Sequence, residues 1–176
     1  MEELTIAGAK VVTPQGVRET DVLIREGKIA RVGRIPKRGE AFSARGLLLL
    51  PGAIDAHVHL ALPVAGTRSA DDFESGTLAA AAGGVTTVID FTLGAPDKSR
   101  PQAIEERIAQ AAPAVVDFSL HAEMIGWTSD RARELLQAAE LGVRSFKFYL
   151  AYADSGRRTR FRRSWRPWRA SANWAG

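Results

Sequence analysis

The sequence predicts an α/β protein in which a small unit of short strands precedes a parallel sheet covered by helices. Two observations predict this class. Residues 1–50 contain short apolar or β-branched segments, and Glu26-Gly27 between two of them is typical of a hairpin turn. From Pro51 onward strand and helix patterns alternate, which implies parallel strands joined by right-handed crossovers. A closed barrel and an open doubly wound sheet both fit this alternation.

The first unit, residues 1–50, is expected to be a small antiparallel portion of a β-sandwich. Its strands are predicted at residues 4–7, 9–13, 21–25 and 28–32. No residue in this unit indicates chemistry.

The second unit, residues 51–154, alternates strands with helices of 9 to 14 residues. Strands are predicted at 51–60, 84–92, 114–125 and 143–152, and helices at 69–82, 99–112 and 129–141. Ser69 is the expected cap of the first helix, and Gly83-Gly84 is expected to end it. No glycine-rich phosphate loop follows the first strand, which argues against a nucleotide site.

Composition narrows the functional classes. The chain has 176 residues, 45% of them apolar, as expected for a globular core. Without cysteine it cannot form a disulfide or a thiolate metal site, so any transition metal must be held by histidine, carboxylate or a less usual ligand. No apolar run approaches the length of a membrane span, and the acidic start is unlike a signal peptide. The sequence therefore predicts a cytoplasmic enzyme without a membrane partner.

The net charge of +4 comes from the end of the chain. Seven arginines follow Ser155, and without them 17 basic side chains face 20 acidic ones, a net charge of −3. The body is thus mildly acidic and gives no reason to expect a nucleic-acid partner. Residues 155–176 form a separate basic segment rich in Arg and Trp.

The stretch from Leu47 to Leu60 carries the strongest chemical signal. Asp55, His57 and His59 alternate with apolar residues, so on a strand they share one face. Two imidazoles about 7 Å apart along a strand can reach one metal, and a nearby carboxylate can fix a ring tautomer. The alternative is a pair of polar residues on a half-exposed strand. Because the flanks are rich in Val, Ile and Leu, we expect burial on both faces, where unpaired imidazoles are costly.

Lys147 is the second chemical signal. It lies in Ser145-Phe-Lys-Phe-Tyr-Leu-Ala-Tyr, among aromatic and aliphatic residues, and shares a face with Ser145 and Tyr149. It is either a lysine that extends to the strand end or a desolvated amine with chemical function. A desolvated amine can react with carbon dioxide to form an anionic carbamate, which is an oxygen ligand able to bridge two metals.

Three stretches together resemble the cyclic amidohydrolases, specifically the hydantoinase and dihydropyrimidinase group. They are Pro51-Gly-Ala-Ile-Asp-Ala-His-Val-His-Leu, the segment from Ala70 to Phe91, and Ser145-Phe-Lys-Phe-Tyr-Leu-Ala-Tyr. The resemblance covers residues 1 to about 158. It implies hydrolysis of a hydantoin or dihydropyrimidine ring by a metal-dependent (β/α)₈ barrel, with a sandwich built from both chain ends.

The resemblance also implies roles for four residues. His57 and His59 match the paired histidines on the more buried metal, and Lys147 matches the carboxylated lysine that bridges two ions, most often zinc. Tyr152 matches the tyrosine that stabilises the tetrahedral intermediate when a metal-bridging hydroxide attacks the ring carbonyl. His57 and His59 should thus face the barrel axis near Lys147, at the carboxyl ends of the first and fourth strands.

Further expectations concern substrate and assembly. The apolar loop after Leu60 favours hydantoinases over dihydroorotases and allantoinases, which usually carry Arg or Asn there. Leu62 and Val64 match positions that gate the exocyclic group of the substrate, a small cyclic amide or ureide. His121 matches no ligand position and is expected to be a hydrogen-bonded strand histidine. Family members are usually homo-oligomers, which predicts a tetramer for an intact protein.

The chain departs from the family pattern at its end. A (β/α)₈ barrel takes roughly 250 residues, whereas four barrel strands are predicted here, and the family's other histidines and aspartate base lie on later strands. The sequence therefore predicts a truncated, inactive form. Shifting the back-translated codons from Ser164 by two bases gives spaced apolar residues that end in Leu-Gly, so we interpret the tail as out of frame.

Three functional hypotheses remain open at this stage. The first is a cyclic-amide hydrolase lineage of which this chain is a truncated product. The second is a non-catalytic, dihydropyrimidinase-like scaffold, against which the retained His57, His59, Lys147 and Tyr152 argue. The third is a binding module that acts through the basic tail, with Arg and Trp interleaved.

Overall fold

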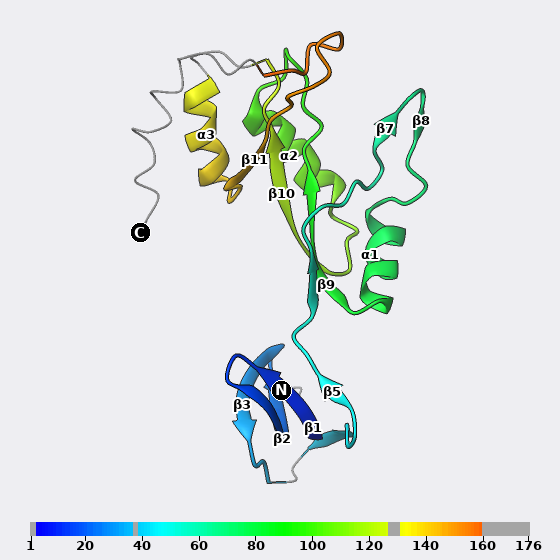
Figure 1. The fold of residues 1–176 in the computed structure, drawn as a ribbon, viewed down its shortest axis with the longest axis vertical. Helices are drawn as coiled ribbons and strands as arrows, with labels where there is room; N and C mark the ends of the chain where they lie inside the picture. Colours follow the sequence, from blue (N-terminus) through cyan, green and yellow to red (C-terminus); the bar gives the residue numbers. More distant parts are fainter. Residues whose placement is uncertain (1–2, 37–38, 127–130, 160–176) are drawn as a thin grey trace. The chain divides into compact units, whose positions relative to one another are not determined.

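The computed structural model describes residues 3–36, 39–126 and 131–159, and the chain divides into two compact units, Met1–Gly52 and Ala53–Gly176 (Figure 1). Most of the predicted basic tail, residues 160–176, lies outside the described residues, as does the predicted start of the third helix. Within the described ranges, no helix combines the length and the apolar character that crossing a membrane requires.

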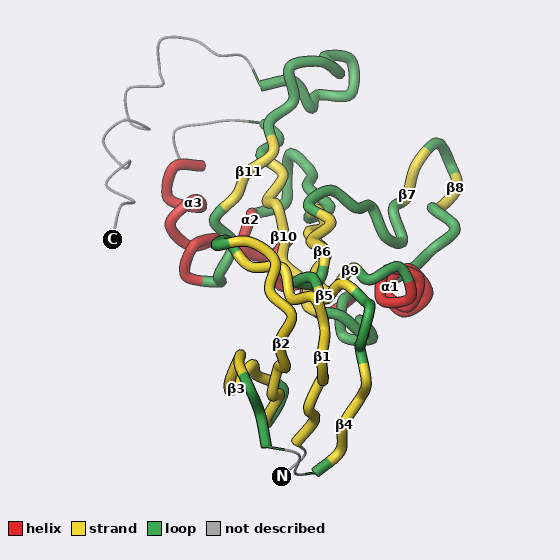
Figure 2. Tube along the Cα trace, turned by 60° about the horizontal axis from the view of Figure 1, so that its bottom comes forward, coloured by secondary structure: helices red, strands yellow, loops and turns green. Residues whose placement is uncertain are grey.

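The first unit is one mixed five-stranded sheet. Its strands are β1 (Glu3–Thr13), β2 (Gly16–Arg25), β3 (Lys28–Gly33), β4 (Glu40–Ser43) and β5 (Leu48–Leu49). Strands β1, β2 and β3 pair antiparallel, while β4 and β5 both pair with β1 in parallel, and Figure 2 shows β1 between β2 and β4. The prediction of a purely antiparallel unit was therefore wrong, because the chain after β3 returns alongside β1 in the same direction.

The two short strands predicted at residues 4–7 and 9–13 are a single strand. The register of β1 against β2 shifts between Ile6 and Ala9, so a bulge and not a strand end separates the two segments. Gly8 at this bulge has a φ of +69°, and its N–H donates to Asp21 Oδ1 at 2.8 Å. The core of the unit consists of Ala9, Val11, Val22 and Ala44.

The second unit is built on a four-stranded parallel sheet. The strands are β6 (Ala53–Asp55), β9 (Val85–Phe91), β10 (Asp117–Glu123) and β11 (Ser145–Lys147), in the order β11-β10-β9-β6. Helices α1 (Phe73–Ala82), α2 (Arg100–Gln110) and α3 (Arg131–Glu140) connect them, and a small hairpin, β7 (Pro63–Val64) with β8 (Thr67–Arg68), precedes α1. The predicted α/β class with a parallel sheet is confirmed.

The two faces of this sheet have different neighbours. Leu120 and Ala122 of β10 pack against Ile104 of α2 and Ala138 of α3, which makes one face the helix-covered side. Because side chains alternate along a strand, the residues between them face the other way. The ladder pairs Phe91 with His121, His121 with Ser145, and Glu123 with Lys147, so these five side chains share the second face, here called the open face.

Both outer strands are shorter than predicted. β6 covers three residues of the predicted 51–60, and β11 covers three of the predicted 143–152. The expected burial of the first strand on both faces was also wrong, since the Ile54 side chain is 64% exposed. The physical reason is its position at the end of the strand order, where β9 is its only ladder partner among the described strands.

The first helix begins later than expected. Asp72, and not Ser69, is its cap: the Asp72 carboxylate accepts the backbone N–H of Ser75, and the Ser75 hydroxyl accepts the backbone N–H of Asp72. The Ser75 N–H and the Ser75 hydroxyl, which both donate to the Asp72 carboxylate, lower the pKa of Asp72. Ser69 instead accepts the backbone N–H of Leu62 at 2.8 Å, which fixes the base of the hairpin. Gly83 ends the helix, as predicted.

A buried hydroxyl ties α1 to the loop before β10. Thr77 Oγ accepts the backbone N–H of Val115 at 3.0 Å and donates to the carbonyl of Phe73. We expect Thr77→Val to lower the free energy of unfolding by about 1–3 kcal/mol, because the isosteric methyl leaves a partly buried N–H without its partner. Urea denaturation measures this, with Thr87→Val on the sheet as the control; equal stability of the Thr77 variant and the parent would contradict it.

Candidate metal centre

The two predicted histidine ligands lie immediately after β6 and not on it. The β6 strand ends at Asp55, whose carboxylate turns back and accepts the backbone N–H of His57 at 3.1 Å. The sequence spacing had suggested that the Asp55 carboxylate fixes the tautomer of a histidine ring. In the structure it instead holds the backbone of His57. Val58 then donates its backbone N–H to the Ile89 carbonyl at 3.1 Å, which keeps this segment beside β9.

The three candidate ligands, His57, His59 and Lys147, all contact the Phe91 ring on the open face. The ring centroids of His57 and His59 each lie 4.6 Å from that of Phe91, and 5.1 Å from one another. The Lys147 ammonium lies 4.0 Å above the same Phe91 ring. Residues about ninety positions apart in the chain are thus brought to one aromatic side chain, which is itself buried.

The surroundings of His59 favour the neutral form of its imidazole. Burial, and then the neighbouring Lys147 cation, lower the pKa of His59 below its ordinary value. Its Nδ1 atom is buried and has no hydrogen-bond partner among the described residues. A neutral ring with an unsatisfied buried nitrogen is costly unless a ligand completes it, and a metal ion is one such ligand.

No group of three or more His, Cys, Asp or Glu side chains in the described part of the chain could hold a metal. Lys147 lies close to His57 and His59, since its amine is over the same Phe91 ring.

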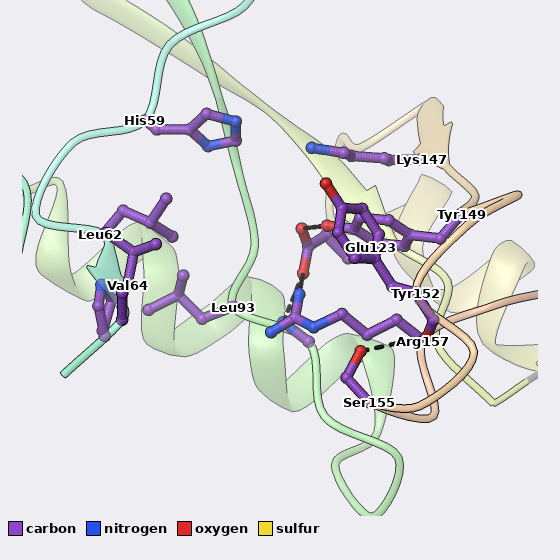
Figure 3. Close-up of a pocket in the computed structure, with 13 residues that line it drawn as sticks. His59, Leu62, Val64, Leu93, Glu123, Lys147, Tyr149, Tyr152, Ser155 and Arg157 are labelled. Carbon is purple, nitrogen blue, oxygen red and sulfur yellow. Dashed lines mark hydrogen bonds and ion pairs between the residues drawn. The ribbon is translucent and has the colours of Figure 1, made fainter.

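A pocket of about 520 Å³ opens beside His59 and Lys147. Figure 3 shows the His59 ring and the Lys147 amine directed toward one another at one end of it. One wall is apolar, from the hairpin segment and the loop after β9, and the other is polar. The apolar wall contains Leu62, Val64 and Leu93, and the polar wall contains Glu123, Tyr149, Tyr152 and Arg157.

The polar wall is organised by Glu123 at the end of β10. This side chain is almost fully buried; its carboxylate accepts the Tyr149 hydroxyl and the backbone N–H of Gly94, and Arg157 lies 3.8 Å away. Burial and the bond to Glu123 raise the pKa of Tyr149 to about 12. Tyr149 therefore stays protonated at any working pH and keeps donating to Glu123.

The other predicted site residues lie at the same pocket. Tyr152 is past the end of β11, with a φ of +62° and a side chain that is 65% exposed. Leu62 and Val64 lie at the hairpin, whose turn places Ala65 and Gly66 at positive φ, as a type I′ turn requires. The structure thus brings Tyr152, Leu62 and Val64 to the pocket that His59 and Lys147 line.

The beginning of the predicted basic tail also belongs to this folded region. Arg158 pairs with Tyr149 as an isolated bridge, and the buried Thr159 donates its backbone N–H to the Tyr149 carbonyl at 2.7 Å. Residues 155–159 therefore pack beside the pocket.

His121 makes hydrogen bonds with both ring nitrogens, to Ser145 and to the Ala56 carbonyl. The prediction of a hydrogen-bonded strand histidine is confirmed.

A model of the amidohydrolase family matches residues 48–169, which include every candidate ligand. The chain belongs to the amidohydrolase family. This amidohydrolase is 42% identical over 153 residues to a D-hydantoinase of Geobacillus stearothermophilus, and the match covers 85% of this chain and 32% of that protein. It is 40% identical over 163 residues to a dihydropyrimidinase of Rattus norvegicus, covering 87% and 31%.

Solved structures give the same result. A crystal structure of a D-hydantoinase superposes with a TM-score of 0.84 at 37% identity, over 89% of this amidohydrolase and 35% of that chain. The chain spans about a third of the length of the curated relatives it matches. The predicted resemblance to the hydantoinase and dihydropyrimidinase group is confirmed.

Sequence reasoning missed three residues of the candidate site, namely Glu123, Phe91 and Arg157. Glu123 follows His121 by two positions at the carboxyl end of a parallel strand, where α/β proteins place their sites, so strand parity could have found it. In the sequence pattern, Phe91 is an apolar residue of a predicted strand like any other. Arg157 is one of the seven arginines that were interpreted as a basic tail. No sequence signal distinguished either of these two.

A glycine in α1 allows the residue after His59 to pack closely. A methyl group at position 76 would lie 2.5 Å from Leu60 Cδ2, and Leu60 is buried. Gly→Ala inside a helix ordinarily stabilises by about 1 kcal/mol. Here we expect Gly76→Ala to destabilise by about 1–3 kcal/mol, because Leu60 must move within a packed core. Thermal unfolding shows whether Gly76→Ala lowers or raises the stability.

A suitable control is Leu78→Ala on the exposed side of the same helix. We expect this control to change stability much less than Gly76→Ala. A gain of stability in Gly76→Ala would show that Leu60 accommodates the methyl group.

Proposed function

We propose that this chain carries one metal-binding half of a hydrolase that opens cyclic amides of the hydantoin or dihydropyrimidine type. The observation that carries the proposal is the convergence of His57, His59 and Lys147 on the Phe91 ring, beside a pocket. The relatives named above support the substrate class, since they are a D-hydantoinase and a dihydropyrimidinase.

The donor set fits a divalent cation, most often zinc in such sites. Imidazole nitrogens are common zinc ligands, and the lowered pKa of His59 leaves its ring free to bind at neutral pH. The unpartnered Nδ1 of His59 would gain a partner. When bound, the cation supplies Lewis-acid polarisation of the ring carbonyl and makes water nucleophilic near pH 7.

Lys147 is proposed to act as a carbamate. Its neutral amine attacks carbon dioxide, forming a C–N bond and releasing one proton, and the product has two oxygen donors that share one negative charge. Two observations support this role: the amine lies over the rings of Phe91 and Tyr149, and it faces His59. The carbamate would supply an oxygen donor beside the two imidazoles, where the described residues form no group of three His, Cys, Asp or Glu ligands.

The pocket walls are proposed to bind the ring. Leu62, Val64 and Leu93 offer an apolar surface to the exocyclic substituent, while the opposite polar wall faces the ring atoms. Tyr152 is proposed to donate its hydroxyl to the oxygen that becomes negative during attack, in keeping with its place at this wall and with the family resemblance. Glu123 orients this wall by holding Tyr149 and attracting Arg157.

Metal loading of the purified 176-residue chain tests this proposal. Equilibrium dialysis against zinc or cobalt should find bound metal that is lost in Lys147→Ala. Lys98→Ala should bind as the parent does, because Lys98 pairs with Glu106 and does not line the pocket. Absence of metal binding in the parent would overturn the proposal and favour a non-catalytic scaffold. Carbon-13 NMR after incubation with labelled bicarbonate should show a carbamate signal that Lys147→Ala removes.

Ring opening is the second measurement. We expect the 176-residue chain by itself to bind metal without enzymatic turnover of hydantoin or dihydrouracil, because its described residues supply donors for one side of a two-metal centre. Chromatography of the carbamoyl product measures this. Metal-dependent turnover that Lys147→Ala abolishes would contradict the predicted inactivity and would support the hydrolase assignment directly. The predicted homotetramer and cytoplasmic location stay predictions, and size-exclusion chromatography tests the first.

A further inference from the structure

We propose that His121 is a positioning residue that joins the two segments bearing the candidate metal ligands. Its role rests on the proposed function, because the residues it positions are His57 and Lys147. The imidazole of His121 lies on β10, between the segment after β6 and strand β11. It contacts both through hydrogen bonds, and neither partner is itself a candidate ligand.

The two hydrogen bonds reach residues close to the ligands. His121 Nε2 lies 2.9 Å from the carbonyl oxygen of Ala56, the residue directly before His57. His121 Nδ1 lies 2.6 Å from the hydroxyl of Ser145, two residues before Lys147 on the same face of β11. One side chain thus connects chain positions 56 and 145, which no strand pairing joins directly.

The partners determine the tautomer of the ring. A carbonyl oxygen can only accept, so Nε2 must carry its proton to bond to Ala56. Nδ1 of the neutral ring is then an acceptor, and the Ser145 hydroxyl donates to it. The Leu120 carbonyl lies 3.4 Å from the same hydroxyl, a longer and weaker alternative acceptor. The neutral Nε2–H tautomer therefore makes both hydrogen bonds, to the Ala56 carbonyl and from the Ser145 hydroxyl.

The segment that carries His57 needs such a connection. The β6 strand has already ended at Asp55, and residues 53–57 are exposed. Between Ala56 and Val58, the described hydrogen bonds besides that of His121 are the Asp55 bond to the His57 N–H and the Val58 bond to Ile89. The His121 bond is the one that fixes the peptide between Ala56 and His57 to the centre of the sheet.

The His121 ring is also restrained from its side. Its centroid lies 4.8 Å from that of Phe91, the ring that contacts His57, His59 and Lys147. The imidazole is therefore held at both nitrogens and by an aromatic neighbour. A ring held in this way can fix the positions of Ala56 and Ser145 relative to one another. Partners that orient metal ligands in this way typically change metal affinity by 10–100-fold when removed.

Four variants of the full 176-residue chain separate this role from a merely structural one. His121→Gln keeps a donor at the place of Nε2, His121→Asn keeps a polar group at the place of Nδ1, and His121→Ala keeps neither. Ser145→Ala removes the second partner and leaves the ring. We expect His121→Gln to bind cobalt nearly as the parent does, and His121→Asn and His121→Ala to bind about 10–100-fold more weakly.

The cobalt absorption spectrum is the distinguishing readout. A change in ligand geometry alters the visible bands, so His121→Ala loaded to saturation should differ from the parent while His121→Gln should resemble it. Metal-free thermal unfolding of each variant is measured in parallel. Equal cobalt affinity and equal spectra in all His121 variants, or losses that follow only the metal-free stability, would overturn the inference.

The tautomer gives a test that does not depend on metal. Nitrogen-15 NMR of the metal-free chain should show a protonated Nε2 and an unprotonated Nδ1 for His121. The opposite tautomer would overturn the inference even if the chain bound no metal. Loss of cobalt binding in His59→Ala, measured with the same preparations, separates failure of the proposed metal site from failure of the His121 role.

Discussion

His59→Ala is expected to reduce zinc or cobalt affinity by more than about 100-fold, beyond the loss typical for residues that only support a ligand. The reason is that the variant removes a proposed donor whose Nδ1 is buried and has no other partner in the described part of the chain. Competition with a chromophoric chelator measures the affinity. Binding within a few-fold of the parent would exclude His59 as a ligand.

The metal-free form of the same variant should remain folded. In the described part of the chain Nδ1 of His59 has no hydrogen bond to lose, so the main cost is the missing contact with the Phe91 and His57 rings. The lowered pKa of His59 means that the unfolded chain binds its proton more tightly than the folded chain. Stability of the metal-free parent should therefore fall as the pH drops below about 6.5, and His59→Ala should weaken this dependence. Urea denaturation at several pH values measures both effects.

Arg107→Ala is expected to be the most destabilising single change, with a loss of about 3–5 kcal/mol. Arg107 of α2 is fully buried and pairs with Asp90 of β9, which is also fully buried. Removing the guanidinium leaves an unpaired carboxylate in the core. It also removes the donor to the Leu60 carbonyl, which lies 2.5 Å from the Arg107 side chain, and the contact over the Phe73 ring.

A double-mutant cycle with Asp90→Asn measures how much of this loss belongs to the ion pair. Asparagine carries no charge to leave unpaired, so the double variant should be more stable than the sum of the single losses implies. Arg144→Ala makes the same change of charge at an exposed position and should cost much less. A loss for Arg107→Ala no greater than that of Arg144→Ala would show that the pair contributes nothing.

The same variant should also weaken metal binding, because Leu60 directly follows His59. This effect is separable from the loss of stability when binding is measured at a temperature where Arg107→Ala is still folded. Unchanged affinity under those conditions would mean that the Leu60 carbonyl does not help to place His59.

The sequence predicted the alternation of strands and helices because that information is local. Ser99 with Pro101 opens α2, and Gly83 closes α1, as their residue types indicate. The sequence pattern predicted β6 and β11 to be longer than they are. The residues at and after their carboxyl ends keep a strand-like pattern, although the backbone there leaves the ladder. Such departures from local pattern are expected where a chain builds a site.

The buried charges were beyond local reasoning. Nothing in the pattern of α2 indicates that Arg107 is buried, since arginine on a helix is usually exposed. Its burial depends on Asp90, seventeen residues earlier on another element, and on the carbonyl of Leu60. The candidate ligands, in contrast, could be named because their spacing and the family resemblance both indicate them.

The alternation of the two faces along β9, β10 and β11 has a consequence for engineering. Each open-face residue has a core residue as its immediate neighbour in the chain: Phe91 follows Asp90, Glu123 follows Ala122, and Lys147 follows Phe146. A single-residue insertion within β10 would turn Glu123 toward the helices and Ala122 toward the pocket. The lining of the pocket can therefore be redesigned by substitutions at alternate positions, whereas an insertion or deletion within a strand would move core side chains into the pocket and pocket side chains into the core.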